Sequence, residues 1–208
     1  MCVTDSAPQP LATFKLDDLA QFTQEGVFSP SDSQDYRVLY VGRDDVHGAL
    51  AYVLSRCTRS LVFNMFGYDD DSLDAQIVRL IEDDNVSVVG TLDKSQSGGV
   101  HERKILEAWT PKVRASFAIG QSATRQISHT KGGVLDSVLA WEGSTNWSAS
   151  GEGEGIGLHG EANKTGFKAQ NNTVTFHIHP LEVGRFAQEL HEEHLVALGQ
   201  EQGAKKGL

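Results

Sequence analysis

Residues that could do chemistry gather in one short stretch, residues 129–148, which reads HTKGGVLDSVLAWEGSTNWS. It places a His, a Lys and an Asp before a Gly-Ser-x-Asn segment. An imidazole can attack as a nucleophile or transfer a proton, and an ammonium can offset the charge of a phosphate. A hydroxyl and an amide can donate hydrogen bonds to phosphoryl oxygens. These residue types fit an anion-handling active site, and the alternative is a polar β-hairpin on a protein surface.

The dipeptide Gly132-Gly133 predicts how these groups come together. It separates strand-like runs that end at Lys131 and begin at Val134, and both glycines can adopt the positive φ of a two-residue turn. With that turn, His129 faces Asp136 across the hairpin. His129 and Lys131 share one face because side chains alternate along a strand. The predicted hairpin brings an imidazole, an ammonium and a carboxylate to one end of a sheet.

Around this stretch the hydrophobic pattern alternates between strands and helices. Runs of β-branched and aromatic residues predict strands, and apolar residues at helical spacing predict helices. Strands are expected at residues 37–41, 60–66, 85–93, 113–119, 125–131, 134–142 and 172–179, and helices at 44–57, 71–84, 101–109 and from about 180. Alternation of strand and helix is typical of an α/β fold with a largely parallel sheet. A glycine-rich loop is expected over residues 143–167.

Composition limits the class of protein. The 208 residues carry a net charge of −10, with 39% hydrophobic and 22% charged residues, as in a soluble globular protein. We expect one domain over residues 1–208, with an irregular arm at 1–35 and a disordered tail at 199–208. No transmembrane run or secretory signal is seen, so a cytoplasmic location is expected. Cys2 and Cys57 form neither a disulfide framework nor a metal-ligand spacing.

Charge is unevenly distributed along the chain. The net negative charge disfavours a general affinity for nucleic acid. Between His101 and Lys131, however, the sequence has six Lys or Arg residues and two Glu residues. We call residues 101–131 the basic segment. It is either an anion-handling face or a chance fluctuation on a solvated surface, and the sequence does not decide between them.

The motif residues match a known pattern. They read His129-x-Lys131-x4-Asp136 and then, after six residues, Gly143-Ser144-x-Asn146. These positions resemble the signature of the phospholipase D superfamily. Three other segments resemble parts of the small bacterial endonucleases of that superfamily, namely FSP (28–30), LDKSQ (92–96) and QNNTV (170–174). The resemblance extends over residues 27–198.

The resemblance implies a central mixed, largely parallel β-sheet flanked by helices on both faces, an αβα sandwich. It also implies a phosphodiesterase that uses no metal or other cofactor. His129 is implied as the nucleophile that forms a covalent phosphohistidine, with Lys131 and Asp136 as the other catalytic residues. Ser144 and Asn146 are implied to bind the phosphate together with Lys131. Asp136 fits the part of an orienting or structural partner better than that of a proton carrier.

The implied mechanism needs a second imidazole, protonated, to give the leaving group its proton. None of the seven other histidines heads a His-x-Lys pair. The second imidazole is therefore expected from a second copy of the chain. This predicts a twofold homodimer in which both subunits contribute the motif to one shared site.

Other residues are secondary candidates. Arg125, Trp147 and His101 are candidate substrate contacts, and Trp147 would either stack on a base or acyl chain or pack in the core. His177 and His179 share a strand face, but no third ligand is spaced to complete a metal site, so none is expected.

The favoured function is a nuclease that cleaves DNA or RNA, because single-motif dimers of this size most resemble the nuclease branch. One alternative is a phospholipase or phosphatidyl transferase acting on a phospholipid headgroup. It ranks lower because no amphipathic helix with a basic face is evident. Another is a non-catalytic nucleic-acid-binding module of the same fold. It stays open because Gln170 or Asn171 stands where an acidic residue often follows the motif.

Overall fold

The chain folds around a seven-stranded mixed sheet in a computed structural model that describes residues 13–153 and 169–206. The strands are β1 (Tyr36–Tyr40), β2 (Ser60–Met65), β3 (Ser87–Asp93), β4 (Phe117–Gly120), β5 (Lys131–Leu135), β6 (Leu139–Gly143) and β7 (Thr173–His177). Their order in the sheet is β1-β7-β6-β5-β2-β3-β4. The pairs β2·β3 and β3·β4 are parallel, and the other four pairs are antiparallel. The α/β class and the mixed sheet are confirmed. The expectation of a largely parallel sheet is wrong, because the β5–β6 hairpin and the strands β1 and β7 pair antiparallel.

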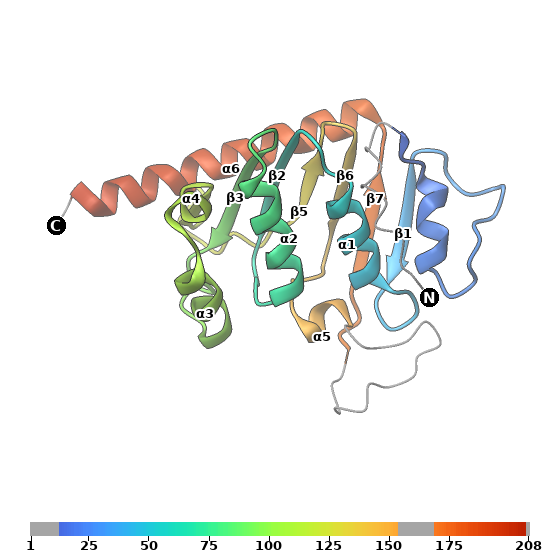
Figure 1. Ribbon diagram of the computed structural model, residues 1–208, viewed down its shortest axis with the longest axis horizontal. Coiled ribbons are helices and arrows are strands. Elements are labelled where there is room, and N and C mark those ends of the chain that lie inside the picture. The colour runs from blue at the N-terminus through green and yellow to red at the C-terminus, as the bar shows by residue number, and fades with distance from the viewer. Residues whose placement is uncertain (1–12, 154–168, 207–208) are drawn as a thin grey trace.

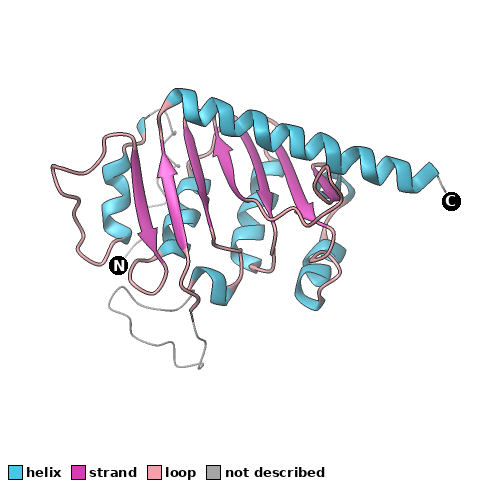
Figure 2. Cartoon of the chain, turned by 180° about the vertical axis from the view of Figure 1, so that it is seen from behind, coloured by secondary structure: helices cyan, strands magenta, loops and turns pink. Residues whose placement is uncertain are grey.

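Helices cover both faces of this sheet (Figure 1). Those described are the 3-10 helix η2 (Leu16–Phe22) and the α-helices α1 (Val46–Ser55), α2 (Asp71–Glu82), α3 (Val100–Ala108), α4 (Pro111–Ala115), α5 (Ala149–Glu152) and α6 (Pro180–Lys206). Helices α1 and α2 lie in front of the sheet in Figure 1, and Figure 2 shows α6 crossing its back. The helices expected at 44–57, 71–84 and 101–109 are confirmed. Across the described residues, every helix is too short or too polar to cross a bilayer.

Two apolar clusters hold the layers together, one on each face of the sheet. The front cluster joins Leu50 of α1 and Ile77 of α2 to Phe63 of β2. The back cluster consists of Val62, Val134, Ala140, Val183 and Leu190. Because side chains alternate along β2, Phe63 faces the front helices while its neighbour Val62 faces α6. Full burial of each such side chain contributes roughly 1.5–3 kcal/mol to folding.

The predicted turn at Gly132-Gly133 is wrong. Both glycines lie inside β5, and the β5–β6 hairpin turns at Asp136 and Ser137, whose φ values are 52° and 58°. The glycine at 133 is required by close packing, because a Cβ there would lie 2.1 Å from the ring of Trp141 on β6. Because the turn lies at residues 136 and 137 and not at 132 and 133, the strand expected at 134–142 is divided between β5 and β6.

The prediction of a strand over residues 125–131 is also wrong, except at Lys131, which begins β5. Residues 121–130 form a turn and an extended coil that leads into β5. The turn is closed by hydrogen bonds from the Ser122 N–H to the Gln126 carbonyl (3.0 Å) and from the Gln126 N–H to the Ser122 hydroxyl (3.1 Å). Such side-chain-to-backbone bonds give the chain an alternative to pairing in the sheet.

The prediction of a disordered tail from residue 199 is wrong as far as Lys206, because α6 continues to that residue. The helix is held by contacts with the edge strand β4 and the residue after it. The Gln121 N–H donates to Gln200 Oε1 at 2.9 Å, and the Ile119 N–H donates to Glu201 Oε1 at 3.0 Å. These bonds also cover part of the open edge of the sheet.

Two other expectations are met only in part. The arm at residues 1–35 contains η2, and its first twelve residues lie outside the described part of the chain. The loop expected at 143–167 contains the short helix α5, and its part from residue 154 onward lies outside the described residues. Cys57 is buried, as expected for a small apolar residue, and Cys2 is not described.

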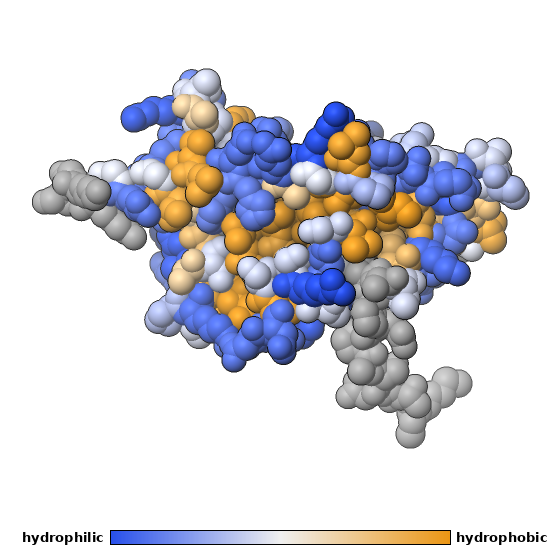
Figure 3. Space-filling model, turned by 90° about the horizontal axis from the view of Figure 1, so that it is seen from above, coloured by the Kyte–Doolittle hydropathy of each residue, from blue (hydrophilic) through white to orange (hydrophobic). Residues whose placement is uncertain are grey.

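The two sides of the sheet at which the strands begin and end differ in character. The upper edge in Figure 1 holds the β5–β6 turn and the start of α6, and exposes Val138 and Leu181. Seen from that side, apolar residues gather across the middle of the molecule (Figure 3). The polar motif residues lie at the lower edge, with the exception of Asp136.

Candidate active site

The motif residues other than Asp136 lie where β2 and β6 end and β5 and β7 begin. Met65, the last residue of β2, pairs with Lys131, the first residue of β5. Gly143, the last residue of β6, pairs with Val174 near the start of β7. We call this side of the sheet, at the bottom in Figure 1, the motif edge. Loops that follow or precede four different strands meet here, as is usual for sites in α/β folds.

Lys131 is a buried cation at this edge. The residue is 5% exposed, its Nζ donates to the carbonyl oxygen of His129 at 2.8 Å, and it lies 4.9 Å from the centre of the Phe66 ring. Burial lowers the pKa of the ammonium, and within the described residues no carboxylate forms an ion pair with it. A buried charge without a counter-ion is unfavourable, so the site is suited to an anionic ligand.

His129 lies beside Lys131 and is exposed to solvent. Its ring packs edge-on against Phe66, with 4.5 Å between the ring centroids. Partial burial lowers the pKa of His129, the charge of Lys131 lowers it further, and the carboxylate of Asp93 opposes the shift. The imidazole is therefore neutral at pH 7, which is the form that can act as a nucleophile.

Two carboxylates position the segment that carries His129. Asp93, which is 1% exposed at the end of β3, accepts a hydrogen bond from the Ser128 N–H at 2.6 Å. Glu193 of α6 accepts one from the Thr130 hydroxyl at 2.9 Å. The residues on both sides of His129 are thus fixed from different elements. Neither carboxylate was predicted as a site residue, although Asp93 belongs to the LDKSQ segment that resembles the bacterial endonucleases.

Asn146 is joined to the Lys131 side of the site through the turn after β2. Its Oδ1 accepts a hydrogen bond from the Gly67 N–H at 3.3 Å, and Gly67 follows Phe66, the ring beside Lys131. A Cβ on Gly67 would lie 3.1 Å from Asn146 Cγ, so glycine permits this close approach. Within the described residues the amide nitrogen of Asn146 makes no hydrogen bond, which leaves it available to a ligand.

Ser144 is fixed by the start of β7. Its hydroxyl donates to Asn172 Oδ1 at 2.9 Å and accepts from the Thr173 N–H at 3.1 Å. Asn172 in turn donates to the carbonyl oxygen of Gly151 at 2.9 Å. Asn172 was not predicted as a site residue. Its position directly before a strand that begins beside the motif was the signal that could have identified it.

Asp136 lies at the far end of β5 from Lys131, so the prediction that it faces His129 is wrong. The hairpin turns at Asp136 itself, which removes it from the motif edge. Its carboxylate accepts hydrogen bonds from three consecutive N–H groups, those of Thr58 (3.1 Å), Arg59 (2.8 Å) and Ser60 (2.9 Å). This geometry fixes the connection between α1 and β2, which is a structural task.

Of the secondary candidates, Trp147 is placed away from any ligand. It is 1% exposed and stacks on Phe63, with 5.5 Å between the ring centroids, so the expectation of a substrate contact is wrong and the core alternative holds. Its backbone nevertheless closes the turn after β2, because the Trp147 N–H donates to the Gly67 carbonyl at 3.0 Å. His101 and Arg125 are both exposed.

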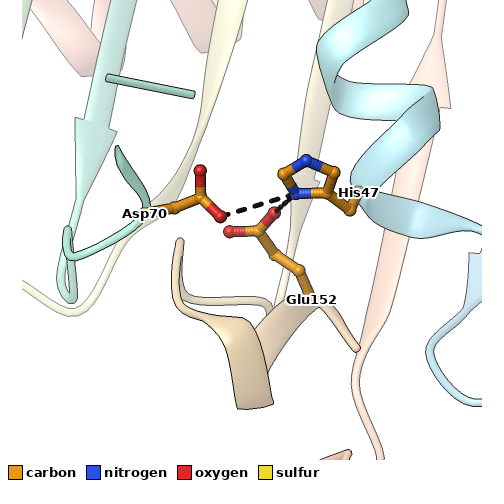
Figure 4. A group of neighbouring side chains, drawn as sticks. All are labelled: His47, Asp70 and Glu152. Carbon is orange, nitrogen blue, oxygen red and sulfur yellow. Dashed lines mark hydrogen bonds and ion pairs between the residues drawn. The ribbon is translucent and has the colours of Figure 1, made fainter. Parts of the chain in front are cut away.

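A cluster of three ionisable side chains adjoins the motif edge (Figure 4). His47 Nδ1 lies 2.6 Å from Glu152 Oε2 and 3.5 Å from Asp70 Oδ2. The Ser72 hydroxyl connects Asp70 Oδ1 and His47 Nε2, each at 3.0 Å. Among the described residues, this is the one group of three His, Cys, Asp or Glu side chains close enough to share a metal ion. Sequence spacing did not reveal it, because its members come from three separate elements.

The imidazole and the two carboxylates are ligand types that Zn²⁺ and related ions accept. The same side chains also form a network of hydrogen bonds with one another, which stabilises the starts of α1 and α2 without an ion. Asp70 caps α2 in this way by accepting from the Leu73 N–H at 2.7 Å.

A pocket of about 310 Å³ opens beside the motif. It is lined by His129, Thr130, Lys131, Glu142, Gly143, Thr175 and Phe186. This volume lies at the lower end of the range of small-molecule sites and is sufficient for one phosphodiester group with its nearest substituents.

No protein-family model matches the chain, and no curated protein sequence matches it. Solved structures do share its arrangement of elements. Nuc from Salmonella typhimurium, described as a phospholipase D family member, superposes with a TM-score of 0.56 at 12% identity, covering 76% of this chain and 94% of that one. NucT from Helicobacter pylori gives a TM-score of 0.55 at 10% identity with the same coverage.

A third similar structure is the phosphatidylserine synthase of Haemophilus influenzae Rd KW20. It gives a TM-score of 0.50 at 10% identity, covering 76% of this chain and 38% of that one. Identities this low carry information about the fold alone. The agreement with Nuc and NucT over nearly their whole length shows that the chain has the fold of the phospholipase D superfamily.

Proposed function

We propose that the protein is a phosphodiesterase, and specifically a metal-independent nuclease that cleaves DNA or RNA through a covalent phosphohistidine. The observation that carries the proposal is the buried ammonium of Lys131 beside the imidazole of His129, whose pKa burial and Lys131 lower. Such a pair places a cation that can bind an anion two residues from a side chain that can act as a nucleophile. The amide of Asn146 lies at the same edge as a further donor, and Ser144 lies there with its hydroxyl donating to Asn172.

In the first step the lone pair of the neutral His129 ring forms a bond with phosphorus, and the bond from phosphorus to the leaving oxygen breaks. Negative charge grows on the non-bridging oxygens, where Lys131 and Asn146 stabilise it. The leaving oxygen takes a proton from a protonated imidazole. In the second step the imidazole that gave up its proton takes one from water, the water oxygen bonds to phosphorus as the phosphorus–nitrogen bond breaks, and both imidazoles return to their starting forms.

The proton donor of the first step is proposed to be His129 of a second copy of the chain. One copy supplies a single motif histidine, and that histidine is exposed at the motif edge, where a twofold partner could present its own. The two imidazoles would then hold different protonation states at one shared site. A fully active protein that sediments as a monomer would refute the shared site.

A nucleic-acid substrate is favoured over a phospholipid. The chain covers 94% of Nuc and of NucT but 38% of the phosphatidylserine synthase, so it corresponds in extent to the first two. The alternatives remain a phospholipase or phosphatidyl transferase and a non-catalytic binding module. The second of these would keep the buried Lys131 as an anion site without turnover.

One experiment distinguishes these functions. The protein and its His129→Ala variant are incubated with plasmid DNA, a single-stranded oligonucleotide, RNA and a phosphatidylcholine analogue, all in the presence of EDTA. We expect cleavage of a nucleic acid by the parent protein and none by the variant. Because His129 is exposed, the variant should unfold at nearly the same temperature. Cleavage that depends on His129 but is confined to the lipid would establish the alternative function.

A further inference from the structure

A second open site lies beside the motif, between the edge strand β4 and the last turns of α6. It is a groove of about 1040 Å³, more than three times the volume of the motif pocket. We call it the α6 groove. Lys94 and Arg125 line one side, Gln121 and Gln200 lie between the sheet and the helix, and the far wall is formed by small residues of α6 such as Gly199 and Gly203.

The residues that line the α6 groove are linked to the segment that carries His129. Lys94 directly follows Asp93, and the Asp93 carboxylate accepts the Ser128 N–H at 2.6 Å. His129 directly follows Ser128. This hydrogen bond therefore joins the residue before Lys94 to the residue before His129.

The two groove cations, Lys94 and Arg125, differ from the basic segment's other cations outside the motif in having no acidic partner in the described part of the chain. Within the described residues, Lys94 and Arg125 form no ion pair, and both are exposed. The other cations of the segment outside the motif have acidic partners, in the pairs Arg103–Glu107, Lys104–Asp71, Lys112–Asp84 and Arg114–Glu201. Glu201 is the acidic residue of the groove lining, and its charge is offset by Arg114 at 2.5 Å. The groove therefore has a net positive charge.

The backbone at Arg125 provides an independent observation. Its φ is 58°, a left-handed conformation that is unfavourable by about 1 kcal/mol for residues other than glycine. The conformation is maintained by a hydrogen bond from the Arg125 N–H to the Ser122 carbonyl at 2.8 Å. Strained positions of this kind collect at ligand sites, and here the strained residue is a cation that lines a groove.

We infer that the α6 groove binds the phosphodiester backbone of a nucleic acid on one side of the scissile bond, with Lys94 and Arg125 each neutralising one phosphate. The inference rests on the proposed function and narrows its substrate to a polymer. A phospholipid carries one phosphodiester, which would occupy His129 and Lys131 and leave both groove cations without an anion. Among the described residues no aromatic side chain lines the groove, so binding there follows the backbone rather than the bases.

The test compares a charge reversal in the groove with one elsewhere. The groove variant is Lys94→Glu with Arg125→Glu. The matched control is Arg59→Glu with Arg185→Glu, which makes the same change in net charge at exposed positions near the upper edge. Both are assayed on a single-stranded oligonucleotide and on bis(4-nitrophenyl) phosphate, a phosphodiester too small to reach the groove.

We expect the groove variant to raise the KM for the oligonucleotide at least tenfold more than the KM for the small phosphodiester, and the control to raise neither. In a neutralised variant, Lys94→Gln with Arg125→Gln, the slope of log KM against log salt should fall by about 1.4, because each lost contact to a single strand removes about 0.7. Equal effects on both substrates, or an unchanged KM for the oligonucleotide, would overturn the inference.

The failure of the inference can be separated from that of the proposed function. If the parent protein cleaves the small phosphodiester through His129 while the groove variant binds oligonucleotide normally, the groove inference alone is wrong. If neither substrate is cleaved, the proposed function is wrong, and binding of a fluorescent oligonucleotide tests the groove by itself. Sedimentation of the groove variant completes the test, because a change of oligomeric state would assign the groove to a subunit interface and overturn the inference.

Discussion

Lys131 donates a hydrogen bond from Nζ to the carbonyl oxygen of His129, 2.8 Å away. The cation of the motif thus folds back onto the backbone of the proposed nucleophile, beside the ring of Phe66. A neutral carbonyl and an aromatic ring offset the charge of a buried ammonium only in part. An incoming phosphate would supply the missing negative charge. Replacing Lys131 with an uncharged residue should remove the unfavourable free energy of burying the ammonium.

Replacing Lys131 with Met should therefore inactivate the protein without destabilising it. Activity is expected to fall by roughly two to three orders of magnitude, because the transition state loses its buried cation. The free energy of unfolding should stay equal or rise. Since burial lowers the pKa of Lys131 below its ordinary value of 10.5, the gain is full below the lowered pKa, shrinks as pH rises through it, and is lost above 10.5, where neither state keeps the proton.

Urea unfolding at several pH values, together with a cleavage assay, measures both effects. Lys131→Arg serves as the control that keeps the charge and should not show the pH-dependent gain. A loss of more than about 1 kcal/mol in Lys131→Met would mean that the ammonium stabilises the fold, contrary to the argument from burial.

The acid limb of kcat/KM should report the pKa of His129. Burial and Lys131 lower this pKa from 6.5, so activity should fall with a midpoint below pH 6.5. The Asp93 carboxylate opposes the shift, so Asp93→Asn should move the midpoint to still lower pH. Glu193→Gln changes a carboxylate that contacts Thr130 and should leave the midpoint in place. An upward shift in Asp93→Asn would exclude His129 as the group that titrates.

Asp136→Ala should destabilise the protein while the rate per folded molecule stays unchanged. The substitution leaves the N–H groups of Thr58, Arg59 and Ser60 without their acceptor, at an expected loss of about 2–4 kcal/mol. Asp136→Asn keeps an acceptor oxygen and should lose less. Thermal unfolding and kcat, measured at a temperature where both variants are folded, check the two effects. A large fall in kcat would return Asp136 to the catalytic machinery.

Chelation should leave the reaction intact. The proposed mechanism uses no metal, so dialysis against EDTA is expected to preserve kcat. His47→Gln should also preserve it while lowering the melting temperature, because His47 connects Glu152 to Asp70. If EDTA and His47→Gln both abolish turnover and added Zn²⁺ restores the dialysed protein, the cluster holds a metal ion that the reaction requires.

Much of the fold was accessible from local sequence pattern. Runs of β-branched residues predict the strands β1, β2 and β3. Apolar residues at helical spacing predict the helices α1 and α2 between them. The prediction of a turn at Gly132-Gly133 is wrong, although this dipeptide has the local features of a turn. The reason for those glycines lies on the neighbouring strand, in the ring of Trp141, and a local pattern cannot show it.

The same limit applies to the candidate site. Motif spacing identified His129 and Lys131 before their surroundings were known. It could not identify Asp93, Glu193 or Asn172, since each acts through a contact with a distant segment. It also misplaced Asp136, because a fixed spacing along the chain does not say which end of a strand a side chain occupies.

The position of α6 has a consequence for biosynthesis. Val62 and Val134 form part of the back face of the sheet, yet their partners Val183 and Leu190 belong to the last of the described elements along the chain. While the polypeptide is being synthesised, that apolar face stays bare until α6 leaves the ribosome, and the edge of β4 stays open with it. A nascent chain in this state is prone to aggregation and is a suitable client for chaperones. Ribosomal pausing within α6 should therefore lower the yield of native protein more than pausing after it.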